Sequence, residues 1–228
     1  MKLSHSARFA ALSAICALAL AGCSNNQPVA PAQSYGAKEA ADVLVRAGNS
    51  YVASLKESGG VTLNMTEASV RLDQENHNME VRGLDGTRFQ LVGITTYLDA
   101  SQESDPDAFV EADFGDFVAL GVSAERAEYE MALLKLLAAL PEQLPKWSSN
   151  IQTAVLKGDT YVISVKREAV RGIRKTDIVG DPAFEFTVKN GNLTGWGIAG
   201  AKQQHMTIAG FSAVHIDKPE HIVQRPHA

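Results

Sequence analysis

The chain of 228 residues carries 21 Lys and Arg against 26 Asp and Glu, and 45% of its residues are apolar. The net charge of −5 argues against a nucleic-acid partner, because phosphate surfaces require clustered cations. Two cysteines are too few for a disulfide framework or a cysteine-based zinc site.

The first 22 residues have the order of a secretory signal peptide. Lys2 and Arg8 precede an apolar run from Phe9 to Leu20, and small residues follow the run. As a helix, this run is too short to span a hydrocarbon layer of about 30 Å. Residues 1–22 are therefore predicted to be removed on export.

The residues at the end of this signal, Leu20-Ala21-Gly22-Cys23, resemble the lipobox of bacterial lipoproteins. In that class the cysteine thiol receives diacylglycerol, the chain is cut before the cysteine, and the new amine is often acylated, with palmitate among the acyl groups. The small-x-small triplet Ala19-Leu20-Ala21 leaves open an ordinary signal-peptidase site.

Cleavage before Cys23 has consequences for the mature protein. Removing Lys2 and Arg8 leaves 19 cations against 26 anions, a net charge of −7. Cys16 leaves with the signal, so the folded part has no free thiol. One acyl chain binds a membrane marginally, whereas two or three bind stably. We therefore expect attachment through a diacylglyceryl, N-acylated Cys23 at the extracytoplasmic face of a cell membrane.

Residues 23–37 are predicted to form the lipidated N-terminus and a flexible tether. Residues 24–37 carry no charge and no apolar periodicity, and they contain two prolines. One folded domain is expected over 38–220, followed by a loose tail over 221–228.

The domain begins with a helix and continues with short strands. Apolar residues at three- and four-residue spacing predict an amphipathic helix from Lys38 to the Ser58-Gly59-Gly60 break. Asp85-Gly86 is typical of a tight hairpin. The strands expected in this part are 61–66, 69–73, 78–84, 88–92 and 109–114, and residues 93–98 either continue the fourth of these or begin its neighbour.

A second helix is predicted from Ser123, and its later turns are apolar on nearly every side. A surface helix needs one apolar stripe, so water is expected to reach this helix little or not at all. Pro141 and Pro145 are expected to end it.

The remaining residues alternate as strands. Lys157-Gly158-Asp159 and Asn190-Gly191 are predicted hairpin turns, and Pro219 is expected to close the domain. The strands expected here are 151–156, 160–166, 183–188, 193–198, 204–208 and 212–216. Hairpin connections predict an antiparallel sheet of about 11 strands in an α+β fold.

This order of elements resembles the LolA/LolB-like fold, in particular the LppX/LprG group of actinobacterial lipoproteins. The matching features are the lipobox with its tether, the helix ending in Leu55-Lys56-Glu57-Ser58, the leucine-rich helix between two strand sets, and a final Val-x-Ile-x-x-Pro pattern formed by Val214, Ile216 and Pro219. The resemblance implies an antiparallel half-barrel with helices on its concave side. It also implies an apolar cavity for an acylated lipid, a glycolipid or a lipoprotein.

Several apolar residues are candidates for the wall of such a cavity, although each is equally compatible with an ordinary core. They are Leu133, Leu134, Leu137, Leu140, Tyr97, Phe114 and Phe186. Sequence does not report packing density, so core and cavity wall remain alternatives.

No catalytic or metal site and no cofactor is predicted. The serines lack the Gly-x-Ser-x-Gly and Ser-x-x-Lys motifs. The acidic stretch from Asp99 to Asp113 lacks calcium-loop spacing, and the cations Arg167, Arg171, Arg174 and Lys175 read as a solvated loop or as a contact to anionic head groups. We expect a non-enzymatic lipid-binding or lipid-transfer lipoprotein. The alternative is an envelope sensor or assembly protein that uses the same fold to bind a protein partner.

Overall fold

The computed structural model describes residues 33–84, 86, 88–101, 105, 107–112, 124–170 and 181–223, with side chains left out for 33, 34, 124–130 and 203. These residues form two compact units. Unit 1 contains residues 58–130 and the segment from 209 onward; unit 2 contains the residues up to 57 and residues 131–208. The described chain is α+β, with twelve strands paired antiparallel to their neighbours and two long helices, which confirms the predicted class.

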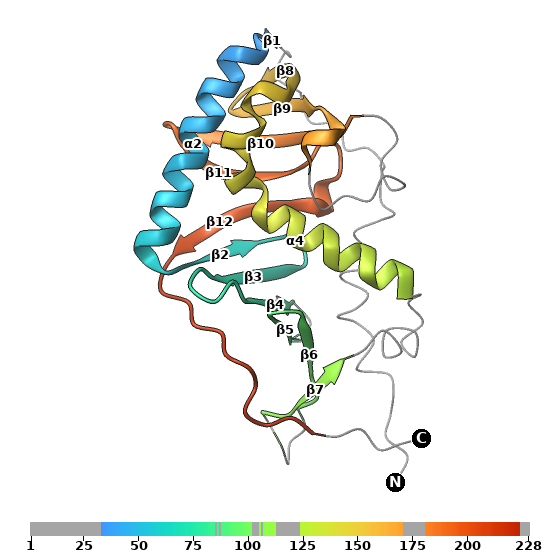
Figure 1. Cartoon of the computed structure of the whole chain (residues 1–228). Helices are drawn as coiled ribbons and strands as arrows, with labels where there is room; N and C mark the ends of the chain where they lie inside the picture. The colour runs from blue at the N-terminus through green and yellow to red at the C-terminus, as the bar shows by residue number, and fades with distance from the viewer. Residues whose placement is uncertain are drawn as a thin grey trace. The chain divides into compact units, whose positions relative to one another are not determined.

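Unit 2 contains most of both long helices and six strands, the last of which continues into unit 1 from residue 209. The helices are α2 (Ala37–Ser58) and α4 (Ala124–Trp147), and α4 enters the unit at Met131. In spatial order the strands are β1 (Gln33–Tyr35), β8 (Ile151–Lys157), β9 (Thr160–Val165), β10 (Ala183–Lys189), β11 (Asn192–Ile198) and β12 (His205–Phe211) (Figure 1).

The predicted turns of this unit are confirmed. Lys157 pairs with Thr160 across the β8–β9 turn, where Gly158 has a φ of 58°. Asn190 and Gly191 have φ values of 51° and 80°, the two left-handed positions that a type I′ hairpin requires.

Both helices pack on one face of the unit 2 sheet. Trp196 pairs across the strands with Phe186 and Met206, so these three side chains share a face. The ring of Tyr51, on α2, meets Trp196 edge-on at a centroid distance of 5.4 Å. The indole of Trp196 also reaches α4, and Figure 1 shows both helices over the same strands.

The prediction that Pro141 ends the second helix is wrong. α4 continues to Trp147 with both prolines inside it. Pro141 cannot donate to the carbonyl of Leu137, but Trp196 Nε1 donates to that oxygen at 2.6 Å. The missing backbone bond is therefore replaced by a side chain of the sheet.

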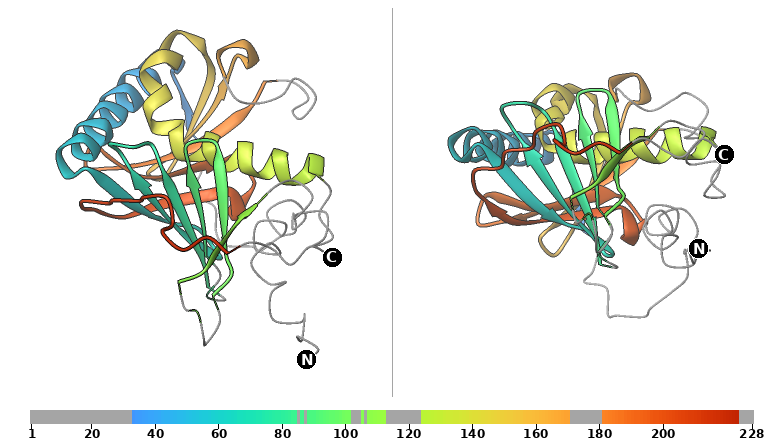
Figure 2. Two further views of the ribbon diagram at one scale, coloured as in Figure 1. Left: turned by 60° about the horizontal axis from the view of Figure 1, so that its bottom comes forward. Right: turned by 90° about the horizontal axis from the view of Figure 1, so that it is seen from below.

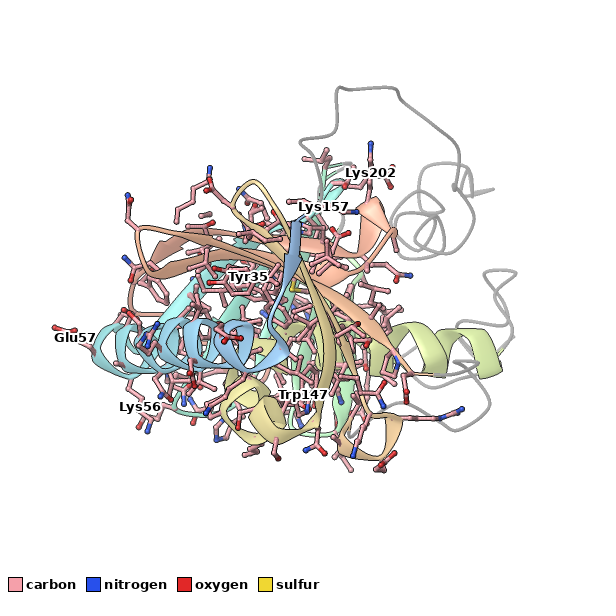
Figure 3. All side chains as sticks on the ribbon, turned by 90° about the horizontal axis from the view of Figure 1, so that it is seen from above. Tyr35, Lys56, Glu57, Trp147, Lys157 and Lys202 are labelled. Carbon is pink, nitrogen blue, oxygen red and sulfur yellow. The ribbon has the colours of Figure 1, made fainter. Side chains whose placement is uncertain are left out.

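The ordered domain begins earlier than residue 38. Residues 33–35, expected in the tether, form strand β1 and pair with β8, with Tyr35 opposite Ala154. Tyr35 packs edge-on against Tyr161 at 5.5 Å. Figure 3 looks onto this edge of the sheet; Tyr35 lies over the strands, whereas Lys56 and Glu57 point away from them at the far end of α2.

Unit 1 is built on a six-stranded meander. In spatial order, which is also chain order, the strands are β2 (Gly60–Asn64), β3 (Ala68–Asp73), β4 (Met79–Gly83), β5 (Arg88–Val92), β6 (Thr95–Asp99) and β7 (Phe109–Ala112). The pairing of Arg82 with Arg88 confirms that the strands predicted at 78–84 and 88–92 are antiparallel neighbours, whereas Asp85 lies outside the described residues.

The pairing register divides this meander into an apolar and a polar face. Val70 lies opposite Val81, and Val81 lies opposite Phe89, which makes one face apolar. The polar face carries Arg71, Glu80, Arg82, Arg88, Gln90, Tyr97, Asp99 and Phe109, together with Gly60, Asp73 and Asn78 at one end.

The prediction that 204–208 and 212–216 are two separate strands is also wrong. β12 runs as a single strand through Gly210. Residues 212–223 form an extended segment that does not turn back to pair with β12. We call this segment the C-terminal strap. It crosses the polar face of unit 1, as Figure 2 shows in red, and it includes His221 and Ile222, which were expected in a loose tail.

Hydrogen bonds to the backbone of the strap hold it at two places. The amide of Ile216 donates to Asp73 Oδ2 at 3.0 Å, and Asn78 Nδ2 donates to the Ile216 carbonyl at 2.7 Å. At the other end the Phe109 amide donates to the His221 carbonyl, and Val223 donates to the Phe109 carbonyl. The strap therefore also covers the outer edge of β7.

Candidate functional site

The apolar layer of unit 2 contains most of the predicted cavity residues. Leu133, Leu134, Leu137 and Leu140 on α4 and Phe186 on β10 are all buried, the last three at 1% exposure or less. Between residues 133 and 141 of α4, only Lys135 is exposed and Ala139 is half-buried. Ala132, Glu142 and Lys146 are exposed as well, so together with Lys135 and Ala139 one stripe of α4 faces solvent, and the expectation that water hardly reaches this helix is wrong.

Aromatic side chains fill the space next to these leucines. Trp196 contacts the ring of Tyr51 and the Leu137 carbonyl, so it joins both helices to the sheet. Trp147, at the end of α4, stacks on Phe184 at 5.0 Å and donates through Nε1 to the Ala169 carbonyl at 3.0 Å. The C-terminal half of α4 is thus held to the sheet at two tryptophans.

The two helices approach each other closely at a glycine. A Cβ on Gly48 would lie 2.9 Å from the Pro141 carbonyl oxygen and 3.2 Å from Leu144 Cβ. Pro145 leaves this Pro141 carbonyl without its usual helical donor, and the Gly48 Cα lies against it. Glycine is therefore required at position 48 for the packing of α2 on α4.

The other predicted site residues do not join this layer. Tyr97 is buried in unit 1, on the polar face of the meander. Phe114 and Cys23 lie outside the described residues, as do Arg171, Arg174 and Lys175. Among the predicted residues, the structure brings together only those of α4 and β10.

A polar site that sequence reasoning missed lies on the other unit. Glu80 is 3% exposed, and three arginines surround it on the polar face of the meander. Arg71 Nη1 lies 3.0 Å and Arg82 Nε 2.8 Å from Glu80 Oε1, and Gln90 Nε2 donates to Oε2 at 3.2 Å. We call Arg71, Arg82 and Arg88 the arginine cluster.

Arg88 is bound less tightly than the other two arginines. Its Nε lies 3.8 Å from Glu80 Oε2 and 3.9 Å from Asp99 Oδ2, both beyond hydrogen-bond distance. Its guanidinium carbon lies 4.5 Å from the centre of the Phe109 ring. Within the described part of the chain, the buried Nε of Arg88 has no hydrogen-bond acceptor.

The cluster keeps Glu80 ionised. Burial alone raises the pKa of this carboxyl, but hydrogen bonds from Arg82, Gln90 and Arg71 outweigh burial, so the pKa lies below its usual value. A two-residue turn at Asp85-Gly86 would place Arg82 opposite Phe89, whereas the observed register places it opposite Arg88, so no local signal in the sequence pointed to this cluster.

The described residues contain no group of three His, Cys, Asp or Glu side chains placed to hold a metal ion. None of the described helices is long and apolar enough to cross a membrane. Comparisons with models of protein families, with curated proteins and with solved structures found no match. The described residues form an antiparallel α+β protein with an apolar layer between helices and sheet in unit 2 and a buried ion cluster in unit 1.

Proposed function

We propose that this chain is a membrane-anchored lipoprotein that binds or transfers a lipid or acylated molecule, and that it acts by binding rather than by catalysis. The ligand is a lipid, a glycolipid or the acyl part of a lipoprotein, held between α4 and an antiparallel sheet curved as a LolA-like half-barrel. The observation that carries the proposal is the apolar face of α4, on which Leu133, Leu134, Leu137 and Leu140 are all buried.

This face supports an apolar ligand because sites for such ligands are lined mainly by apolar side chains. The leucines Leu133 and Leu134 lie N-terminal to the two tryptophan contacts that hold α4 to the sheet. In this proposal the acyl chain lies along Leu133 and Leu134, on the N-terminal side of the hydrogen bond that joins Leu137 to Trp196.

The N-terminal sequence supplies the membrane attachment in this proposal. Acylated Cys23 is followed by nine residues before β1 begins at Gln33. At about 3.3–3.6 Å per residue these nine residues reach at most about 30 Å. The tether then keeps unit 2 within reach of the bilayer that contains its ligand.

Native mass spectrometry of the non-acylated Cys23→Ala protein tests the lipid-binding part. A lipid-sized mass that remains bound under gentle ionisation and disappears after delipidation is the expected result. Leu133→Trp adds volume to the apolar layer and should lower the bound fraction, whereas Lys135→Trp adds it to the exposed side of the same helix and should not. A protein that carries no lipid and takes none up from vesicles contradicts the proposal; a stable protein partner in its place supports the sensor alternative.

A further inference from the structure

We propose that the arginine cluster on the polar face of unit 1 is a binding site for a phosphate group. The proposal does not depend on the apolar layer of unit 2, and it holds whether or not that layer accepts an acyl chain. It rests on the number of donors, on their placement on the three neighbouring strands β3, β4 and β5, and on the incomplete pairing of Arg88.

The cluster has more hydrogen-bond donors than its carboxylates can use. Each guanidinium has five N–H donors, whereas one carboxylate offers about four acceptor positions. Glu80 already accepts from Arg71, Arg82 and Gln90. The side chains of Arg71 and Arg82 remain 35% and 50% exposed, so their remaining donors are open to solvent.

The register places two like charges side by side. Arg82 lies directly opposite Arg88 on neighbouring strands, an arrangement that is unfavourable without a counter-charge. Glu80 contacts Arg82 closely but Arg88 only at 3.8 Å. Three cations therefore share the two anions Glu80 and Asp99, and these five side chains sum to a charge of +1 in a protein of net charge −5. Two further carboxylates, Asp73 and Glu111, lie beyond them on the same face.

A phosphate group fits this arrangement for geometric reasons. Its oxygens can accept from two guanidinium groups at once, and arginine is the side chain best suited to such paired contacts. Glu80 and the Phe109 ring hold Arg82 and Arg88 in place, so little side-chain freedom is lost on binding. The neutral neighbours Ser69 and Gln90 lie next to the cluster on the same face.

Titration with inorganic phosphate at constant ionic strength, followed by calorimetry, tests the site. Saturable binding at one site is expected, with sulfate able to compete and acetate much weaker. Arg82→Gln and Arg88→Gln should each raise the Kd about tenfold or more, since each removes a charge-assisted hydrogen bond. Lys56→Gln, which removes one exposed cation from the end of α2, should leave the Kd unchanged.

Vesicles distinguish the two sources of the phosphate. If the phosphate belongs to a lipid head group, the Cys23→Ala protein should bind vesicles that contain phosphatidylglycerol more strongly than vesicles of phosphatidylcholine alone. Adding Arg82→Gln to this protein should abolish the difference. Phosphate binding without any vesicle preference assigns the site to a soluble phosphate compound. If Arg82→Gln and Arg88→Gln melt cooperatively and bind phosphate as the parent protein does, or if the parent binds none, the cluster is an internal ion network and the proposal is wrong.

Discussion

The indole Nε1 of Trp196 donates a 2.6 Å hydrogen bond to the backbone carbonyl of Leu137, four residues before Pro141. That carbonyl is the one that Pro141, which has no N–H, cannot serve. A residue of β11 thus completes the hydrogen bonding of α4, and the helix passes through a proline that sequence rules expect to end it.

A double-mutant cycle measures this dependence. Trp196→Phe leaves the buried Leu137 carbonyl without a donor and should lower the free energy of unfolding by about 1–3 kcal/mol beyond the loss of ring contacts. In a Pro141→Ala background the new backbone N–H can donate to that carbonyl. The loss of unfolding free energy caused by Trp196→Phe should then be smaller than in the parent by about 1 kcal/mol or more. Urea unfolding of the four proteins gives the coupling; strictly additive costs mean that the indole bond does not replace the missing helical one.

Gly48 gives a second test of the packing around the prolines. Alanine has the better helix propensity by about 1 kcal/mol, but its Cβ would lie 2.9 Å from the Pro141 oxygen. Gly48→Ala should therefore destabilise the protein by about 1–3 kcal/mol, the usual cost of overpacking. Asn49→Ala, at the exposed neighbouring position, should be neutral or slightly stabilising. Equal stability of Gly48→Ala and the parent contradicts the close approach of α2 and α4.

Local signals predicted much of the fold. The helix expected from Lys38 is α2, and the Asn190-Gly191 turn has the two positive φ values that its sequence indicates. The misses depend on distant residues. Nothing near Pro141 shows that Trp196 will serve Leu137, and nothing near Ile216 shows that Asp73 will bind its amide. The same holds for the site, since Arg71 joins Arg82 and Arg88 only through strand register.

Asp73 is the residue that should decide whether the C-terminal strap stays in place. Its Oδ2 accepts from the Ile216 amide, and its Oδ1 accepts from the amides of Glu75 and Asn76. Asp73→Ala should speed hydrogen exchange of the strap by about 10- to 100-fold, because each hydrogen bond to a charged group contributes about 1.5–3 kcal/mol.

Asp217→Ala is the matched control for this experiment. Asp217 lies 3.0 Å from His215 in an exposed pair, and such pairs contribute little. Exchange of the strap should change by no more than a few-fold. Equal effects of the two substitutions would mean that the strap is not held through Asp73.

The lowered pKa of Glu80 predicts an acid-sensitive contribution to stability. Hydrogen bonds from Arg82, Gln90 and Arg71 outweigh burial, which acts in the opposite direction. The contribution is fully present above the unfolded-state pKa of about 4.3 and is lost as the pH falls through the lower folded-state value. The free energy of unfolding of Glu80→Gln should therefore be lower than that of the parent at pH 7, and the two should converge below pH 4. A constant difference down to pH 3 would contradict the assignment.

Membrane attachment is predicted to depend on one residue. With lipidation at Cys23 as the anchor, Cys23→Ala should move the protein from the membrane fraction to the soluble fraction of the exporting cell. Metabolic labelling with palmitate should mark the parent and not the variant. Retention of Cys23→Ala in the membrane fraction would mean that the signal has been misread.

The central claim is that an acyl chain binds in the apolar layer of unit 2, and both tryptophans of the chain lie in that layer. Tryptophan fluorescence of the delipidated Cys23→Ala protein, titrated with a lipid brominated on its acyl chain, tests the claim most directly. The account predicts saturable quenching near one lipid per protein, with no quenching by the unbrominated lipid and weaker quenching at the same lipid concentration for Leu133→Phe, which adds volume to the layer without adding an indole. Lipid binding that leaves the fluorescence of Trp147 and Trp196 unchanged, or no binding at all, would contradict it.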